Sequence, residues 1–387
     1  MGHCGQSCPQ AANYNTTARH KGERHHQRRG RVDGINGGGN MVDVFFATNR
    51  NPDNETNPTD FGTGFSSTGL ANLRFGIADV EIRKTEDGFG KYELKGKTLT
   101  VDPDIDVKAG NDPPDKPSTR VMHKAREAMS HHKRDTVVFI HGYNVTFDEA
   151  LLSAAVIRKN FDAHENALGG RGVNVALFSW PSDGSMMPWL AYSSDRKDAR
   201  ASGPAVGRAF FKIADFLKKL EPEQKCEQNI HLIAHSMGNY VLRNAIQSVK
   251  NEFPGRMPRV FDQIFMMAAD EDDDAFEYEH KLKPLPQLAR RVNVYFNNGD
   301  LAMGIADKTK GQPDRLGADG PRVPWKVPGK VTSIDCTPVV SGLVEHSYYV
   351  KSEAVVKDML QALVGTPSME IKGRVFDPET NRYRLEG

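Results

Sequence analysis

The chain has 387 residues, of which 38% are hydrophobic and 26% charged, and its formal net charge is only +1. This composition is typical of a globular protein with one large domain or two small ones. The near-neutral charge excludes an overall field that would recruit nucleic acid or an anionic membrane, and no run of about 18 apolar residues predicts a membrane span.

The first 40 residues differ from the rest of the chain. They hold six lysines and arginines against two acidic residues, lack apolar periodicity and end in a run of glycines. We expect residues 1–40 to be a disordered basic head, and because no aromatic residue interleaves with the basic cluster, no nucleic-acid partner is predicted. No signal-peptide pattern is present, which favours a cytoplasmic location.

Four cysteines, Cys4, Cys8, Cys226 and Cys336, form neither a disulfide framework nor a complete zinc motif. Their spacing favours a reducing compartment, and no metal site is predicted from it.

From residue 41 onward, short apolar runs alternate with helical patterns. Such alternation predicts an α/β domain with a mostly parallel sheet and helices on both faces, over residues 41–365. A C-terminal tail, 366–387, contains two apolar runs around turn residues and predicts a small hairpin. Strands are expected at 42–46, 76–82, 93–101, 136–140, 173–178, 230–234, 260–268, 292–296 and 331–334, and helices at 147–161, 195–220, 237–249 and 352–363.

Ser236 is the candidate nucleophile. It lies in the segment Ile-Ala-His-Ser-Met-Gly, between an expected strand and an expected helix. A strand-to-helix elbow exposes a serine hydroxyl and needs small residues two positions before and after it, which here are Ala234 and Gly238. The helix dipole there favours developing negative charge. The alternative interpretation is that Ser236 only caps the helix.

Backbone amides that could stabilise an oxyanion come from two places in such a site. One is the residue after the nucleophile, Met237, and the other is the loop after an earlier strand. The segment His141-Gly142-Tyr143-Asn144 directly follows the strand expected at 136–140. We therefore predict that the amides of Tyr143 and Met237 form the oxyanion hole, although the loop is also compatible with an ordinary turn.

The acid and the base should follow the nucleophile in the order Ser, acid, His. Asp300 follows the strand expected at 292–296, while Asp270 ends the preceding strand and is the alternative acid. His346 is the only histidine after Asp300, which makes it the predicted base. The acidic run that begins at Asp270 suggests a cation site or, more simply, a solvated loop.

With these residues in view, the chain resembles an uncharacterised bacterial family of α/β-hydrolases that are esterase-like or lipase-like. The resemblance covers roughly residues 41–365 and implies the α/β-hydrolase fold and hydrolase activity, without a defined substrate. The matching segments are 44–50, 141–144, 178–184, Tyr192, Asp195, 234–238, 269–270 and 346–348.

The most distinctive matching segment is Ser-Trp-Pro-Ser-x-Gly, which follows the strand expected at 173–178. It should open toward the carboxyl edge of the sheet, where ligands bind in such folds. Trp180 and Trp189 are therefore candidates for an acyl or aromatic pocket, or alternatively for packing in the core or a lid. His141, Asn144 and His235 are further pocket candidates, and residues 301–328 suggest a lid.

These patterns predict a serine hydrolase, most simply a carboxylester hydrolase that acts on a small-molecule acyl ester through Ser236, His346 and Asp300. A thioesterase, peptidase or acyltransferase would use the same triad, because fold does not fix substrate. A hydrolase-fold binding protein without turnover is the alternative from another class. The proposed chemistry requires no metal or organic cofactor, and the sequence does not indicate an oligomeric state.

Overall fold

A computed structural model describes residues 41–70, 72–85, 88–102, 117–182, 188–220, 222, 225–252, 255, 257–300, 314–340 and 346–386. Within these ranges, the side chains of residues 117–119 and 188–191 are not described. The predicted head, residues 1–40, lies outside the described residues. Residues 301–313 of the predicted lid also lie outside them.

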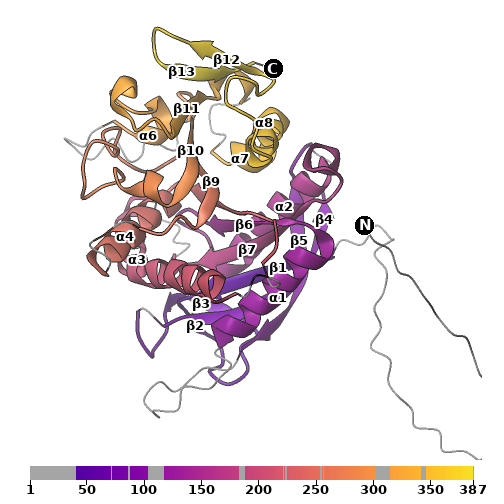
Figure 1. Ribbon diagram of the computed structural model, residues 1–387. Coiled ribbons are helices and arrows are strands. Elements are labelled where there is room, and N and C mark those ends of the chain that lie inside the picture. Colours follow the sequence, from indigo (N-terminus) through magenta and orange to yellow (C-terminus); the bar gives the residue numbers. More distant parts are fainter. Residues whose placement is uncertain are drawn as a thin grey trace, which may run out of the picture. The chain divides into compact units, whose positions relative to one another are not determined.

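An eleven-stranded sheet runs through the described part of the chain in the order β12-β13-β11-β10-β9-β8-β6-β7-β1-β4-β5 (Figure 1). In the part of this order that runs from β13 to β1, every pair of neighbouring strands is parallel. The pairs β1–β4, β4–β5 and β12–β13, at the two edges of the sheet, are antiparallel. The predicted mostly parallel sheet is confirmed. Its strands are β1 (Met41–Thr48), β4 (Arg74–Lys84), β5 (Tyr92–Val101), β6 (Asp135–Ile140), β7 (Val173–Ser179), β8 (Ile230–His235), β9 (Phe261–Met267), β10 (Ala289–Phe296), β11 (Val331–Asp335), β12 (Arg374–Asp377) and β13 (Arg382–Leu385).

Helices cover both faces of the sheet, as the alternation predicts. On β6, Val137 and Phe139 pack in one apolar cluster with α2 (Phe147–Asp162) and α8 (Glu353–Leu363). The alternate residues Val138 and Ile140 pack in a second cluster with α3 (Pro188–Lys219) and α4 (Gly238–Glu252). Because successive side chains of a strand point to opposite faces, this single strand separates the two halves of the core.

Local sequence signals explain where several helices begin. Thr146 and Glu149 form a capping box at the start of α2, and the Ser352 side chain caps α8. Helix α3 begins well before the expected residue 195. It packs closely on α4 at Gly203. A Cβ atom at this position would lie only 2.5 Å from Cβ of Asn244, so the absence of a side chain allows the close approach.

Several elements were not predicted. Helix α1 (Pro117–His132) covers the same face of the sheet as α3, and its many basic residues and histidines obscure an apolar stripe that includes Val121, Ala125 and Met129. The others are the hairpin of β2 (Arg50–Pro52) and β3 (Phe61–Phe65), the short helices α6 (Leu316–Asp319) and α7 (Tyr348–Lys351), and the 3-10 turns η2 (Glu165–Leu168), η4 (Leu285–Gln287), η5 (Pro324–Lys326) and η6 (Thr337–Val339).

The predicted C-terminal hairpin is present as β12 and β13, and it extends the main sheet. Strand β13 pairs in parallel with β11, and Leu385 is buried in the core. The hairpin therefore lies at the opposite edge of the sheet from β5 (Figure 1). The division of the chain into 1–40, 41–365 and 366–387 stays a prediction.

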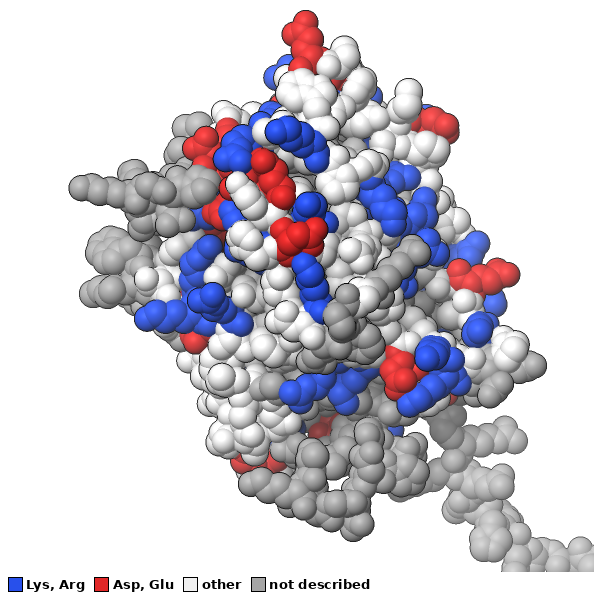
Figure 2. Space-filling view, turned by 60° about the vertical axis from the view of Figure 1, so that its left-hand side comes forward, with Lys and Arg blue, Asp and Glu red and all other residues white. Residues whose placement is uncertain are grey.

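Charged side chains on the face in Figure 2 form several separate groups, with acidic residues between basic ones. None of the described helices is long and apolar enough to cross a bilayer. Cys226 and Cys336, the two cysteines within the described residues, form no disulfide.

Candidate active site

Ser236 lies in the sharp turn between β8 and α4. Its φ is +53°, and the residue is 2% exposed. A non-glycine residue in the left-handed region is strained, and this strain is characteristic of a nucleophile elbow. The amide of Ser236 donates to the carbonyl of Met267 (2.9 Å), and the Ser236 carbonyl accepts from the amide of Asp270 (3.1 Å), so the end of β9 holds the turn in place.

Two glycines allow the backbones to meet around this turn. A Cβ atom at Gly238 would lie 2.6 Å from the carbonyl oxygens of both Ile140 and His141. A Cβ atom at Gly142 would lie 3.0 Å from Cβ of Ser236. The elbow and the loop after β6 are therefore in direct contact, and a side chain at Gly238 would push them apart.

His346 and Asp300 form a hydrogen-bonded pair beside the elbow. Nδ1 of His346 lies 2.6 Å from Oδ2 of Asp300; the carboxylate is fully buried, whereas the histidine side chain is 18% exposed. Nε2 of His346 is buried and has no hydrogen-bond partner within the described residues. A carboxylate on Nδ1 leaves Nε2 of a neutral histidine as the proton acceptor, which is the arrangement of a general base.

Asp270, the alternative acid, belongs to a different network at the same edge of the sheet. The hydroxyl of Tyr192 donates to its carboxylate at 2.9 Å, while Arg196 and Arg315 lie at 3.5 and 3.6 Å. Among the described residues, no hydrogen bond or ion pair joins Asp270 to a histidine. Of the two candidate acids, Asp300 is the one that the structure brings to His346.

The two predicted oxyanion donors lie on either side of the contact between the elbow and the loop after β6. Met237 directly follows Ser236. Tyr143 directly follows Gly142, the glycine that is in contact with Ser236. The neighbouring amide of Asn144 is already used, since it donates to Asp195 (2.8 Å). Within the described part of the chain, neither the Tyr143 nor the Met237 amide donates to a protein acceptor. The Asn144 side chain is exposed, and its φ of +57° turns the loop.

His141 and Trp180 are interior residues. Their rings stack with centroids 5.3 Å apart and an interplanar angle of 8°, and Trp180 is 0% exposed. Burial and the nearby Arg50 lower the pKa of His141 to about 3, so the ring is neutral. For Trp180 the structure thus favours core packing over a pocket wall. The side chain of Trp189 lies outside the described ones.

His235, another pocket candidate, is also largely buried. Its ring packs against those of His346 and Tyr349, with centroid distances of 4.7 and 4.6 Å. Burial, followed by the nearby His346, lowers the pKa of His235 well below its usual value. His235 is therefore a neutral neighbour of the candidate base, and its position is that of a support for His346.

The prediction of a solvated loop for the acidic run was wrong. Residues 270–274 are all at most 8% exposed. They are neutralised by basic side chains: Arg243 lies 3.1 Å from Glu271, and Lys281 lies 2.8 Å from Asp272. No three metal-ligating side chains come together as a metal site anywhere in the described ranges, this run included.

Comparison with known proteins gives a family for this arrangement. A family model described as alpha/beta hydrolase of unknown function (DUF900) matches residues 119–366. The chain belongs to this family. The match spans every residue of the site from His141 to His346, and it confirms both the predicted fold and the resemblance to an uncharacterised hydrolase family.

This DUF900 chain is similar to a curated protein, the uncharacterized protein alr1448 from Nostoc sp. (strain PCC 7120). The two are 27% identical over 227 residues, which is 54% of this chain and 51% of the relative. The chain thus spans about half the length of the curated relative that it matches. No solved structure matches the chain.

Two arginines of this DUF900 protein support the site, and sequence reasoning gave neither a role. Arg50, the first residue of β2, donates from Nε to Oγ of Ser179 (2.8 Å) and from Nη2 to the carbonyl of Val145 (2.7 Å), which ties β2 to the end of β7 and to the loop after β6. Arg50 ends the segment 44–50, one of those on which the family resemblance rests, so a signal existed. Arg315 bridges Asp270 and Asp272 from a distant segment, and no local pattern marks it.

Proposed function

We propose that the protein is a serine hydrolase of the carboxylester type, with Ser236 as nucleophile, His346 as general base and Asp300 as the acid that orients the histidine. The proposal goes beyond the family, whose members are hydrolase-like proteins of unknown function. The observation that carries it is the Asp300–His346 hydrogen bond of 2.6 Å, which leaves a buried, unpartnered Nε2 on a histidine whose carbonyl is bonded by His235, the residue before a serine at positive φ.

In the first step, Nε2 of His346 accepts the hydroxyl proton of Ser236 while the serine oxygen attacks the ester carbonyl carbon. The carboxylate of Asp300 holds Nδ1–H and stabilises the imidazolium that forms. The amides of Tyr143 and Met237 donate to the oxyanion of the tetrahedral intermediate. His346 then protonates the departing alkoxide, which leaves an acyl group on Ser236.

The second step reverses these roles with water. His346 accepts a proton from a water molecule that attacks the acyl carbonyl, and it returns the proton to Ser236 as the carboxylic acid departs. The strained serine and its position at the start of α4 support this assignment, because the helix N-terminus favours the negative charge that develops on the oxyanion.

Reaction of the purified protein with a fluorophosphonate, followed by peptide mass spectrometry, tests the proposal. A single adduct on Ser236 is expected, and Ser236→Ala should remove it without changing the melting temperature. Ser130→Ala on α1 is the matched control, because the hydroxyl of this serine donates to the carbonyl of Glu127 in its own helix. It should keep full labelling.

Activity assays then separate the reaction classes. Hydrolysis of p-nitrophenyl butyrate and longer esters, lost in Ser236→Ala, would support the carboxylester assignment. Preferential turnover of acyl thioesters or of peptide substrates would replace it by a thioesterase or peptidase on the same three residues. No adduct and no turnover in the folded protein would overturn the proposal in favour of a binding protein without catalysis.

A further inference from the structure

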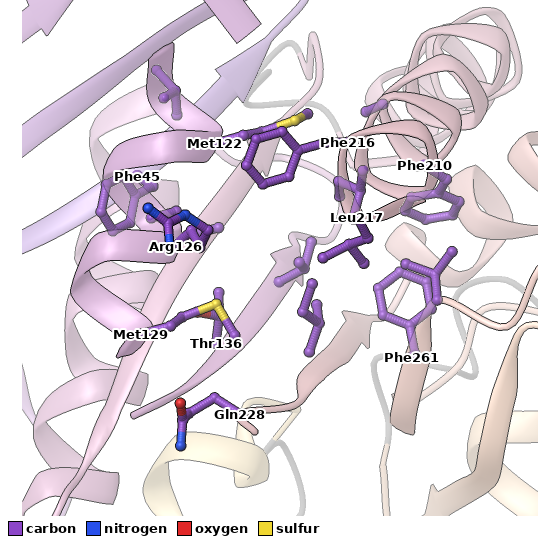
Figure 3. A pocket seen from close by; sticks show the side chains of 18 of the residues that line it. Phe45, Met122, Arg126, Met129, Thr136, Phe210, Phe216, Leu217, Gln228 and Phe261 are labelled. Atoms are coloured by element: carbon purple, nitrogen blue, oxygen red, sulfur yellow. The ribbon is translucent and has the colours of Figure 1, made fainter. Parts of the chain in front are cut away.

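A hollow lies on the sheet face covered by α1, α3 and α4, in the gap between α1 and α3. It has a volume of about 450 Å³, within the range of small-molecule binding pockets. Figure 3 shows α1 on one side of the hollow and Phe210, Phe216 and Leu217 of α3 on the other, with apolar side chains from both helices directed into the space between them.

The floor of this cavity includes two small residues of the sheet. Ala47 of β1 and Ala176 of β7 lie on adjacent strands, where Phe45 pairs with Ala176 and Ala47 pairs with Phe178. Alanine is depleted in strands because it packs little surface against its neighbours. Here the two methyl groups leave a trough that a pair of larger strand residues would fill.

The walls are continuous apolar stripes. On α1, Met122, Ala125 and Met129 recur at spacings of three and four residues and so share one helix face. On α3, Phe210, Ile213 and Leu217 do the same. An alkyl chain between these stripes would be in contact with carbon atoms on three sides, which is the environment that removes it from water.

The cavity is separate from the candidate active site. Its inner polar residues, Thr136 and Gln228, lie near the amino ends of β6 and β8, whereas Ser236 follows the carboxyl end of β8. A strand of six residues rises roughly 20 Å at about 3.3 Å per residue, so the two ends are far apart. Ligands at one end would leave the other accessible.

Two buried polar atoms lack partners at this end of the cavity. Thr136 is 5% exposed and lines the cavity, yet its Oγ1 has no hydrogen-bond partner within the described residues. Oε1 of Gln228, a second lining residue, is buried and unpartnered in the same way. Buried polar groups of folded proteins are nearly always paired, so two such atoms in one cavity indicate a polar ligand group.

The charges around the cavity favour a negative ligand group. Arg126, Lys225 and Arg259 line it, and the last two are exposed. The acidic lining residue, Asp262, is already bound by Arg290, whose Nη2 lies 2.8 Å from Oδ2. A hydroxyl such as that of Thr136 donates to a carboxylate, and the amide of a glutamine presents its nitrogen after a half-turn about its last bond.

We propose that this cavity binds an anionic amphiphile of the fatty-acid type. Its alkyl chain lies over Ala47 and Ala176 between α1 and α3, and its carboxylate meets Thr136 and Gln228. This site is distinct from the esterase site and does not depend on it.

Fluorescence titration with 11-(dansylamino)undecanoic acid tests the proposal in the full-length Ser236→Ala protein, so that hydrolysis and acylation at the elbow play no part. Saturable binding is expected, and laurate should displace the probe at least about tenfold better than dodecyltrimethylammonium, which has the same chain and the opposite charge. Equal displacement by the two, or no saturable binding, would overturn the proposal.

Two variants locate the bound probe. Ala176→Phe fills the floor and should weaken binding at least about tenfold. Thr136→Val keeps the side-chain shape and removes one hydrogen bond to the ligand, so the affinity for the probe should fall about fivefold. This variant tests the proposal even if Ala176→Phe does not fold. Thr98→Val, at an exposed position of β5, is the matched control and should bind as before.

The wild-type protein, labelled on Ser236 with a fluorophosphonate, distinguishes the two sites. Unchanged probe affinity after labelling supports a separate cavity. Loss of binding after labelling, with Thr136→Val and Ala176→Phe unaffected, would place the probe at the elbow and overturn the inference. If Ser236 takes no label, the titrations in Ser236→Ala still decide this proposal alone.

Discussion

The side chain of His235 donates a hydrogen bond from Nε2 to the backbone carbonyl of His346 over 3.1 Å. The residue before the candidate nucleophile is thereby joined to the residue that would act as its base. Because burial keeps His235 neutral, only one ring nitrogen carries a proton, and this bond fixes which one. The other, Nδ1, is close to Gly142, where a Cβ atom would lie 3.2 Å away.

His235→Phe should lower kcat about tenfold, because the loop that carries His346 loses its anchor to the elbow while the ring volume is retained. His235→Gln restores a donor and should recover most of the activity. His235 is a positioning residue, so the pH profile of kcat/KM should change in the Phe variant and return in the Gln variant. Equal activity of Phe, Gln and wild-type proteins would contradict this role.

Asp300→Asn should reduce kcat/KM by about 10³-fold or more, because an amide in place of the carboxylate favours the wrong histidine tautomer. The fold should persist, since Asn keeps the size of the side chain. Rates of p-nitrophenyl ester hydrolysis and of fluorophosphonate labelling measure the loss.

Asp270→Asn is the matched control, and we expect it to reduce stability rather than activity. It leaves Arg196 and Arg315 without the carboxylate that they share, and removing one partner of a buried ion pair costs about 3 kcal/mol or more. Its melting temperature should fall while the residual folded protein keeps its activity. The opposite ranking of activities would transfer the acid role to Asp270.

Much of the candidate site follows from order along the chain. Ser236 has a local elbow pattern, and His346 is the only histidine after Asp300, so topology alone selects it. The Asp300–His346 contact agrees with that order. These residues are predictable because the fold places the carboxyl ends of parallel strands at one edge.

Other features depend on long-range packing that no local pattern encodes. The acidic run is typical of a surface loop, but Arg243 and Lys281 reach it from other segments and make its burial possible. Trp180 follows a strand end, as a pocket residue would, yet the ring of His141 covers it. Helix α1 was missed because its polar residues mask a narrow apolar stripe.

Glu271 should make stability depend on pH. The side chain is buried, and desolvation raises its pKa to about 7 despite Arg243. A carboxyl whose pKa is higher in the folded state than in the unfolded chain stabilises the fold below about pH 4.5. This stabilisation is lost as the pH rises through about 7. At about 1.4 kcal/mol per pKa unit, the change is on the order of 3 kcal/mol.

Urea denaturation at pH 5 and pH 8 checks this expectation by comparing wild type with Glu271→Gln, which mimics the protonated form. The variant should gain stability relative to wild type as the pH rises. Glu279→Gln, at an exposed carboxyl near Lys250, is the control and should show no such trend. A constant difference between Glu271→Gln and wild type would mean that Glu271 does not change its protonation state across this range.

Gly238→Ala should destabilise the protein by about 3 kcal/mol, near the upper end of the cost of overpacking. The added methyl would meet two backbone carbonyl oxygens at 2.6 Å, and backbone atoms move aside less readily than a flexible side chain. Gly255→Ala is the matched control, because no atom of the described residues lies within 4 Å of its Cβ position, and its stability should equal that of wild type. The free energy of unfolding in urea measures both.

The same variant links stability to chemistry at the elbow. Separation of α4 from the end of β6 would displace the amide of Met237 relative to Ser236 and should slow fluorophosphonate labelling as well. If Gly238→Ala were as stable and as reactive as Gly255→Ala, the strand and the helix would have to be farther apart than the structure places them. The contact between the elbow and the loop after β6, on which the oxyanion assignment depends, would then be wrong.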